Sequence, residues 1–386
     1  MHSIDTIVDL RSLPAYDHLE ASKRFFRSSS LELGHVENLA SLELLVSCLP
    51  RLSSTMPHDT IYALLHVASD VAEGVTFIVD YTSPSVDVFQ QFVKHCIEAS
   101  QSIDIICRSW APEQNDFETI SRESQTPYEL LQKESEALPT WIRTVSSLPF
   151  GMKPKRIGRM NGDSFVGTPD RSFYNASKGT LGVALFSVIE SKAKKARSII
   201  VSGFEVGDIM RISTRCIFGM VPDDAVSMSG WRQNDERVRD YFWRTLVADR
   251  GPEGVAPPLW YHNACAYWLD LCGGDDINTG QYLRERHPSM AIEYLKRVQS
   301  VVCNRHFFMV SCRDGKKLFG LAPANTLLSD TVCILHGCSV PVVLRPSRTF
   351  EDSWELIGEC FVYGIMEGEA MRVESFLKSV REFQIV

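Results

Sequence analysis

The stretch that decides the fold is DTVCILHGCSVPVVLRP, residues 330–346, in which two short apolar runs flank a turn. The runs 332–335 and 340–344 are rich in Val, Ile and Leu, which favour strands. Gly337 lies in the turn, and Pro341 stands near the start of the second run, where a proline is tolerated. The stretch therefore predicts two short strands joined by a turn.

Four further runs of the same kind extend this pattern over residues 306–372. Gly, Pro, Asn or Asp residues separate them. Six short strands at this spacing predict a small antiparallel meander or barrel near the C-terminus. We expect residues 306–386 to form this β module, closed by a helix around Arg372–Phe383. The four further runs are His306–Val310, Lys317–Leu321, Trp354–Ile357 and Phe361–Ile365.

The N-terminal residues 1–110 carry apolar side chains at three- and four-residue spacing, which is typical of helices. The pattern predicts helices over Leu39–Leu49, over Ile61–Ala68 and from Ser85 onward, with Ser85 as the N-cap of the third. Residues 111–180 are instead rich in polar residues, Gly and Pro. They predict a loop-rich connector.

Residues 181–305 are expected to form a mixed, aromatic-rich core. The runs Thr180–Ile189 and Ser198–Val201 predict strands, and Gly203 and Gly207 are expected to bracket a turn. Helical periodicity returns after residue 231. The expected fold class is therefore α+β, with a helical N-terminal region, this aromatic-rich mixed central part, and the small antiparallel β meander or barrel near the C-terminus.

The chain has 386 residues and a formal net charge of −8, from 40 basic and 48 acidic residues. The densest basic patch holds only Lys192, Lys194, Lys195 and Arg197, so charge disfavours a nucleic-acid partner. No apolar run reaches the roughly 18 residues that a membrane helix needs, so we expect no membrane span. The 11 cysteines form no C-x-x-C pair, which predicts reduced thiols. Because no secretory signal is visible at the start, the expected location is cytoplasmic.

Common catalytic motifs are absent from the sequence. The chain lacks G-x-G-x-x-G, G-x-x-x-x-G-K-[ST], H-E-x-x-H and G-x-S-x-G, so we expect no nucleotide, metal or other cofactor. His262–Cys265 and His336–Cys338 have ligand-like spacing, but each pair supplies two ligands where a structural zinc needs four. We interpret Gly162–Gly167 as a simple loop, and the acidic pairs Asp223–Asp224 and Asp275–Asp276 as solvated turns.

Aromatic residues gather between residues 231 and 268, where four of the seven tryptophans lie. Such side chains line pockets for apolar ligands, but they also fill ordinary cores, and both interpretations stay open. In the pocket interpretation, Arg244 and His262 are the candidate catalytic residues, as hydrogen-bond donors to a substrate carbonyl. The candidate substrate-binding residues are Trp231, Tyr241, Trp243, Trp260, Tyr267 and Trp268.

Six segments of this half of the chain are Phe242–Asp249, Arg305–Val310, Gly320–Pro323, Asp330–Gly337, Val340–Pro346 and Ile357–Glu369. Their order and spacing resemble the middle and C-terminal scaffold region of fungal heterokaryon-incompatibility (HET) proteins. Further upstream, His58–Leu65 and Asp80–Tyr81 resemble the middle region of the same family. The resemblance implies a structural scaffold.

The chain also departs from the HET pattern. The family's N-terminal HET domain is not recognisable, so the association of that domain with cell death is not implied here. His66 stands where the family carries a glycine, and only Trp141–Thr144 corresponds to its tryptophan-rich segment. Within the scaffold, we expect Arg345 to pair with Glu359 or Glu367 across the sheet.

Three functions remain open. The first, which we favour from the sequence, is a cofactor-independent cyclase or isomerase of a fungal natural-product pathway. It would be of the intramolecular Diels–Alder or a related pericyclic type, and it would bind an apolar small-molecule substrate. The second is a non-enzymatic HET-like regulatory protein with protein partners, which we expect to show an exposed apolar patch. The third is a truncated remnant with no active role.

Overall fold

The computed structural model describes residues 26–28, 36–38, 40–49, 56–71, 77–113, 137–153, 156–192, 194–231 and 238–386. The chain divides into two compact units. Unit 1 comprises Met1–Gly158 and Thr168–Arg171, and unit 2 comprises Arg159–Gly167 and Ser172–Val386. The sequence analysis divided the chain into four regions, and this finer division stays a prediction.

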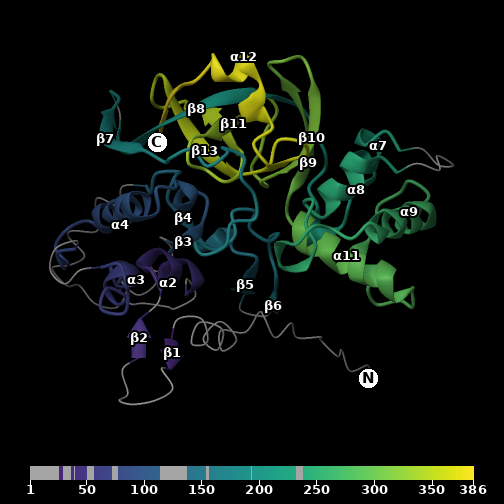
Figure 1. Ribbon diagram of the computed structural model, residues 1–386, viewed down its shortest axis with the longest axis horizontal. Coiled ribbons are helices and arrows are strands. Elements are labelled where there is room, and N and C mark those ends of the chain that lie inside the picture. Colours follow the sequence, from purple (N-terminus) through teal and green to yellow (C-terminus); the bar gives the residue numbers. More distant parts are fainter. Residues whose placement is uncertain are drawn as a thin grey trace. The chain divides into compact units, whose positions relative to one another are not determined.

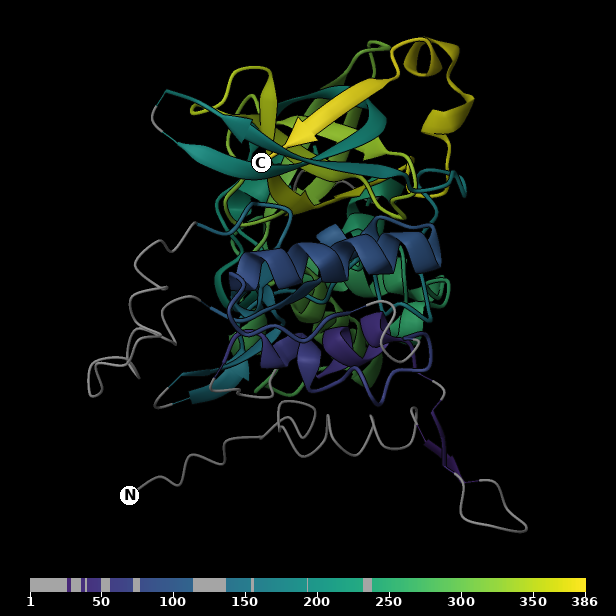
Figure 2. The same ribbon diagram turned by 90° about the vertical axis from the view of Figure 1, so that its left-hand side faces the viewer.

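Unit 1 contains the three predicted helices (Figures 1 and 2). They are α2 (Leu42–Cys48), α3 (Asp59–Tyr62) and α4 (Ser85–Ser100). Helix α3 ends earlier than predicted, because turns replace the helix over residues 63–67. Ser85 is not the N-cap of α4: Pro84 holds that position, and no side chain caps the helix. The fixed φ of proline sets the entry into the helix instead.

Short strands accompany these helices. Strand β1 (Phe26–Ser28) pairs with β2 (Val36–Asn38), and β3 (Ser109–Ala111) pairs in parallel with β4 (Arg143–Thr144). Strand β5 (Phe150–Lys153) pairs with β6 (Arg156–Arg159), where the chain passes into unit 2.

A buried charged group lies inside unit 1. Arg108 donates to Glu43, and its guanidinium lies 3.7 Å from the Asp104 carboxylate. All three residues are buried. Burial raises the pKa of Glu43, although the charge of Arg108 acts in the opposite direction. Because a buried charge is costly without its partner, this group joins α2 to the segment that follows α4.

Unit 2 is built on one large sheet whose central strand is β8 (Lys195–Ile212). Five strands of the sheet close into a ring, because β8, β11, β12, β13 and β15 each pair with the next in this order and β15 pairs again with β8. All of these pairings are antiparallel except that of β13 with β15. The ring members after β8 are β11 (Thr331–Leu335), β12 (Val342–Pro346), β13 (Ser353–Glu359) and β15 (Arg381–Ile385). The predicted α+β class with a C-terminal antiparallel barrel is therefore confirmed.

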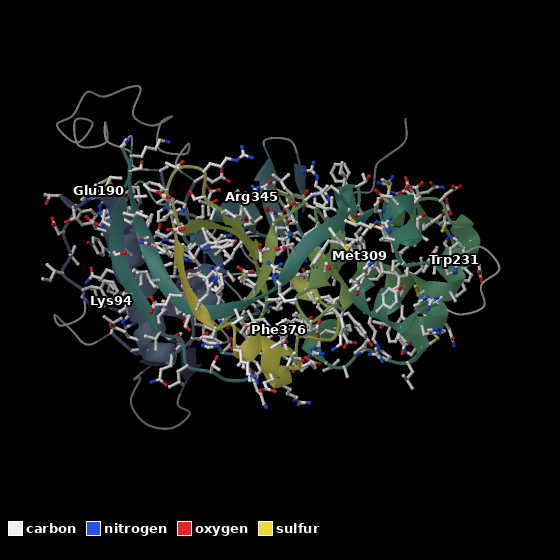
Figure 3. The ribbon with its side chains drawn as sticks, turned by 90° about the horizontal axis from the view of Figure 1, so that it is seen from above. Lys94, Glu190, Trp231, Met309, Arg345 and Phe376 are labelled. Atoms are coloured by element: carbon white, nitrogen blue, oxygen red, sulfur yellow. The ribbon has the colours of Figure 1, made fainter. Side chains whose placement is uncertain are left out.

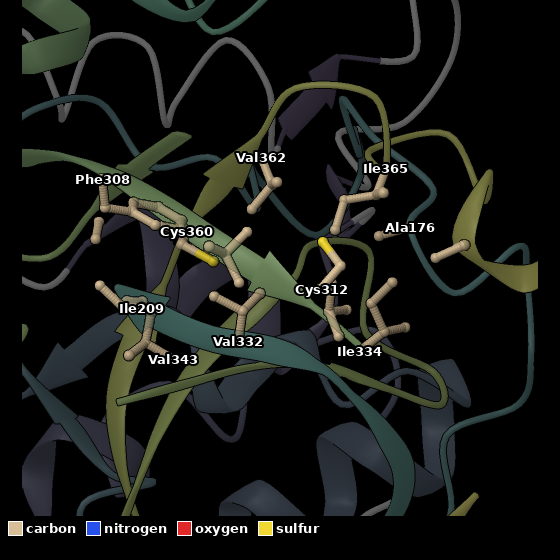
Figure 4. Close-up of a cluster of buried hydrophobic side chains, with 14 of the residues drawn as sticks. Ala176, Ile209, Phe308, Cys312, Val332, Ile334, Val343, Cys360, Val362 and Ile365 are labelled. Atoms are coloured by element: carbon tan, nitrogen blue, oxygen red, sulfur yellow. The ribbon is translucent and has the colours of Figure 1, made fainter. Parts of the chain in front are cut away.

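Further strands extend the sheet from β8. Strands β9 (His306–Cys312), β10 (Lys317–Ala322) and β14 (Phe361–Val362) follow one another on one side. Strand β7 (Ala184–Glu190) pairs with the first part of β8. Apolar side chains of several strands meet in a buried cluster that includes Val332, Ile334, Val343 and Phe308 (Figure 4). The strand pairings therefore enclose the core of unit 2.

Gly203 and Gly207 do not bracket a turn, contrary to the prediction. Both lie inside β8, which runs uninterrupted for 18 residues. A Cβ atom at Gly203 would lie 2.9 Å from the Cα of Leu335, and one at Gly207 would lie 2.7 Å from the Cα of Cys312. The glycines are therefore needed where neighbouring strands approach the β8 backbone closely.

The predicted C-terminal helix over Arg372–Phe383 is also wrong. Only the short elements η7 (Ala370–Arg372) and α12 (Glu374–Leu377) are helical, and β15 follows them. The side chains of Phe383 and Ile385 are buried, which is the alternation of a strand. Pairing with β8 overrides the helical spacing of this segment.

Helices of unit 2 pack beside β9 and β10 (Figure 1). They are α7 (Asp223–Met228), α8 (Asp240–Leu246), α9 (Trp260–Cys272), α10 (Thr279–Tyr282) and α11 (Ser289–Val302). Phe242 of α8 joins them to the sheet, with ring centroids 6.1 Å from Phe319 and 6.3 Å from Phe307. None of the helices that the structure describes combines the length and apolar character needed to cross a bilayer.

Candidate functional site

The predicted aromatic cluster is an aromatic layer carried mainly by α8 and α9. Trp243 and Trp268 are buried in it, and Trp231 is buried beside Gly274. The indole N–H of Trp243 donates to Asp240 at 3.0 Å, and that of Trp268 donates to the backbone carbonyl of Ala291 at 2.9 Å. Because their polar edges are already bonded, these two indoles act as core side chains whose rings stabilise the packing of α8, α9 and α11.

The other aromatic candidates lie nearer the surface. Tyr241 packs its ring 5.6 Å from Phe319, and its hydroxyl donates to the carbonyl of Ser229. Tyr267 forms a hydrogen bond of 2.9 Å with Nδ1 of His287. Trp260 is partly buried and meets the ring of Tyr261 edge-on at 4.5 Å. These side chains border the layer and are not enclosed by it.

The two candidate catalytic residues both meet Trp243. The guanidinium of Arg244 lies 4.4 Å from the centroid of the Trp243 ring, and the His262 ring meets the same indole edge-on at 6.3 Å. Arg244 donates to the Asp249 carboxylate at 2.6 Å, which offsets its charge. Nε2 of His262 lies 3.2 Å from the carbonyl of Val238. The structure thus places both candidates against Trp243. Each of them already forms a hydrogen bond within the protein, Arg244 with Asp249 and His262 with the carbonyl of Val238.

Tyr261 is the polar side chain of this layer that the sequence interpretation passed over. It is completely buried, and its ring lies 5.0 Å from that of Tyr294. Within the described part of the chain, its hydroxyl has no hydrogen-bond partner. Burial raises the pKa of nearby Cys265 to about 12, so this thiol is neutral. Tyr261 and Cys265 are four residues apart on the buried face of α9. This helical spacing was the sequence pattern that could have indicated a buried Tyr261.

A buried ion pair between Arg305 and Glu359 was also missed. The two side chains lie 3.2 Å apart, and the Arg305 guanidinium is 3.8 Å from the centroid of Phe165. Arg305 further donates to the carbonyl of Asp163 at 2.7 Å. Glu359 accepts hydrogen bonds from the backbone N–H of Phe165 at 2.8 Å and of Val166 at 2.9 Å. The Gly162–Gly167 segment is therefore a loop that this pair anchors.

Arg345 pairs with Asp330, at 2.8 Å, and not with Glu359 or Glu367 as predicted. Thr331 of β11 pairs with Leu344 of β12, so the residues just outside this pair, Asp330 and Arg345, come together. Glu359 is taken by Arg305, and Glu367 accepts from Arg250. The register between β11 and β12 therefore determines that Arg345 pairs with Asp330, which no local sequence pattern indicated.

The two acidic pairs lie side by side. Val221 and Ile277 exchange backbone hydrogen bonds, and the backbone N–H of Asp223 donates to Asp276 at 2.8 Å. Asp224 accepts from the backbone N–H of Thr214 at 2.6 Å. Among the described residues, no group of three His, Cys, Asp or Glu side chains could hold a metal ion. The carboxylates of Asp224 and Asp276 therefore accept hydrogen bonds from backbone N–H groups.

An apolar surface follows strand β7. Leu181, Val183, Leu185 and Val188 are exposed at 62%, 68%, 60% and 48%, respectively. We name these four residues the β7 surface. Leu181 and Val183 lie just before β7, whereas Leu185 and Val188 lie within it. Leu181, Val183 and Leu185 stand at alternate positions, and exposed apolar side chains grouped in this way are of the kind that proteins use to bind partners.

One comparison with known proteins found a match. Residues 260–381 match the family model of the Het-6 beta-barrel domain. The matched residues make up about a third of the chain. The match confirms the resemblance to the C-terminal region of the HET family. No curated protein and no solved structure matches the chain.

The residues that match this family model include α9, α11 and the strands from β9 to β14. Strand β8, which closes the ring against β11 and β15, lies outside the matched residues. The ring is therefore completed by β8, which precedes the matched residues, and by β15, of which only Arg381 belongs to them. The β7 surface belongs to the same preceding segment, next to β8.

Proposed function

We propose that this chain is a non-enzymatic, HET-like regulatory protein that acts by binding other proteins through the β7 surface. The observation that carries the proposal is the exposure of Leu181, Val183 and Leu185 at 60% or more. Water contact with such side chains is unfavourable, and a partner that covered them would gain roughly 25 cal/mol for each Å² of apolar surface. The exposed apolar patch is the feature that we expected of an interaction protein.

The aromatic layer supports catalysis less well. Trp243 and Trp268 are almost inaccessible to solvent, so a substrate would have to displace core side chains to reach them. The cation of Arg244 is paired with Asp249. These contacts favour the interpretation of the layer as the packing between helices and sheet.

Affinity capture from an extract of the producing organism tests the proposal. We expect the wild-type protein to retain specific partners and a Val183→Thr/Leu185→Thr variant to lose most of them. Threonine keeps the β propensity of the strand while it removes the apolar surface. Leu271→Gln is the matched control, because Leu271 is also an exposed leucine of unit 2 but lies on α9. Equal capture by all three proteins would contradict the proposal.

A cofactor-independent cyclase or isomerase of the pericyclic type is the second candidate. The buried Tyr261 hydroxyl favours it, because this unused donor lies in the aromatic layer among the candidate substrate-binding residues. A donor of this kind polarises a substrate carbonyl when a pocket holds the substrate in a reactive shape. Arg244 and His262 are the other candidate donors.

Native mass spectrometry with an apolar extract of the same organism separates the two candidates. The cyclase requires a retained small molecule whose binding falls in Trp260→Ala and whose conversion falls in Tyr261→Phe and His262→Ala. The interaction protein requires no such ligand. If a ligand is retained and converted, the cyclase becomes the function, whatever the capture experiment finds.

A further inference from the structure

This inference rests on the proposed function and concerns the chemistry of the partner. Strand β7 and the first part of β8 form a hairpin in which Glu190 pairs with Lys195 next to the turn. On its other edge, β8 is paired with β15 only from Ile199 onward. The hairpin residues nearest the turn therefore extend beyond the rest of the described sheet, with Glu190 at the outer end (Figure 3).

The apolar side chains follow the strand direction. Leu181 and Val183 precede β7 and Leu185 lies in it, and these exposed residues alternate with less exposed ones, as the two sides of an extended chain do. Gly182 between the first two is buried, which confirms the alternation at this point. Among the described strands, β8 is the single neighbour of β7. An extended segment laid along β7 would place its own alternate side chains against this row.

The turn of the hairpin is basic. Lys195 lies 2.8 Å from Glu190, so these two charges offset each other. Lys192 and Lys194 are exposed, and neither forms an ion pair with any other residue that the structure describes. The hairpin therefore carries two uncompensated positive charges at its turn, further along the chain than the apolar row.

We infer that the β7 surface binds an extended segment of a partner protein that is apolar at alternate positions and acidic at one end. The apolar positions cover Leu181, Val183 and Leu185, and the acidic end lies over Lys192 and Lys194. A lipid surface fits less well, because an inserting hairpin carries its apolar side chains at the turn. Here the turn carries the charge and the strand carries the apolar row.

A random twelve-residue peptide display library, panned on the full-length protein, tests this inference. We expect the enriched peptides to show apolar residues at every second position and an excess of Asp and Glu toward one end. Their binding should weaken about tenfold or more between low and moderate salt, because counterions screen the lysines. Hydrogen exchange of the complex should slow at residues 183–190.

Three variants make the test specific. Val183→Thr/Leu185→Thr should lose the enriched peptides, whereas Lys192→Glu/Lys194→Glu should keep the alternation and enrich basic ends instead. Leu271→Gln should bind as wild type does. Enriched peptides without acidic bias, peptides that bind all variants equally, or binding of vesicles with 30% phosphatidylserine in place of peptides would overturn the inference. If the β7 variant loses its captured partners while no peptide class is enriched, the proposed function survives and this inference fails.

Discussion

The backbone N–H of Val166 donates to the Glu359 carboxylate at 2.9 Å, although the two residues are 193 positions apart in the sequence. The same carboxylate bonds the backbone of Phe165 and the guanidinium of Arg305. Glu359 is the last residue of β13, so the loop 162–167 is attached directly to a strand of the closed ring. The Glu359 side chain thus links the loop 162–167, Arg305 and β13, which share no backbone pairing at this point among the described residues.

Replacing Glu359 should destabilise unit 2 strongly. Glu359→Ala leaves the buried Arg305 cation and two backbone N–H groups without their acceptor, which we expect to cost about 3–5 kcal/mol. Urea unfolding followed by tryptophan fluorescence measures the loss. Glu367→Ala is the control, because Glu367 is half exposed and its pair with Arg250 should contribute about 1 kcal/mol or less. Similar losses in both variants would show that the loop anchor is not important for stability.

A methyl group at Gly207 should disrupt the pairing of β8 with β9. Its Cβ atom would lie 2.7 Å from the Cα of Cys312, so the strands must separate. We expect Gly207→Ala to cost about 2–3 kcal/mol or to prevent folding. Gly280→Ala is the matched control, since the nearest atom to its Cβ is 3.7 Å away and the residue lies on α10. That variant should be neutral or slightly more stable. Thermal melting followed by circular dichroism compares the stability of the two variants. An unchanged melting temperature for Gly207→Ala would contradict the close approach of β8 and β9.

The aromatic layer should behave as core. Trp268→Ala removes a completely buried indole, and we expect it to lower the free energy of unfolding by about 3–5 kcal/mol. Trp260→Ala should cost clearly less, because Trp260 is only partly buried. Chemical denaturation of the two variants compares these losses. A small loss in Trp268→Ala would indicate an open pocket at this position and would favour the cyclase.

Acid should destabilise the protein in part through His336. Burial lowers the pKa of His336 below its ordinary value of 6.5, because desolvation disfavours the charged imidazolium. The unfolded chain therefore binds this proton at a higher pH than the folded chain does. The contribution to stability is complete above pH 6.5 and is lost as the pH falls toward the folded pKa.

The urea midpoint measured between pH 7 and pH 5 tests this expectation. His336→Gln should show a flatter decline than wild type, whereas replacement of the exposed His66 by Gln should leave the decline unchanged. Identical pH dependence in wild type and His336→Gln would refute the role of His336.

Local patterns predicted the local elements well. The strands β9, β10 and β11 lie within two residues of their predicted bounds, because runs of branched and aromatic residues suit a strand that is buried. Helix α11 lies in the part of the chain after residue 231 where the spacing of apolar residues predicted helices. Two predictions failed locally, the Ser85 N-cap and the end of α3. The larger failures concern residues whose state depends on distant segments, namely the interior glycines of β8 and the strand β15.

The candidate site shows the same division. The sequence placed Arg244 and His262 near the tryptophans, and the structure brings both to Trp243. Whether they form a catalytic site stays a prediction. The Arg305–Glu359 pair could not be foreseen, nor could the Tyr261 hydroxyl that has no hydrogen-bond partner among the described residues, because hydrogen-bond satisfaction depends on the packed neighbours of each atom.

The sequence by itself determined much of the periodicity of this protein: most of its helices and strands, the apolar faces of these elements, and the resemblance to HET proteins that the match at residues 260–381 supports. Only the tertiary structure decided which strands close the ring, which acid pairs with Arg345, and which apolar side chains stay exposed on β7. The physical reason is that periodicity arises from backbone geometry over a few residues. Strand register, ion pairing and exposure arise only when segments far apart in the chain meet.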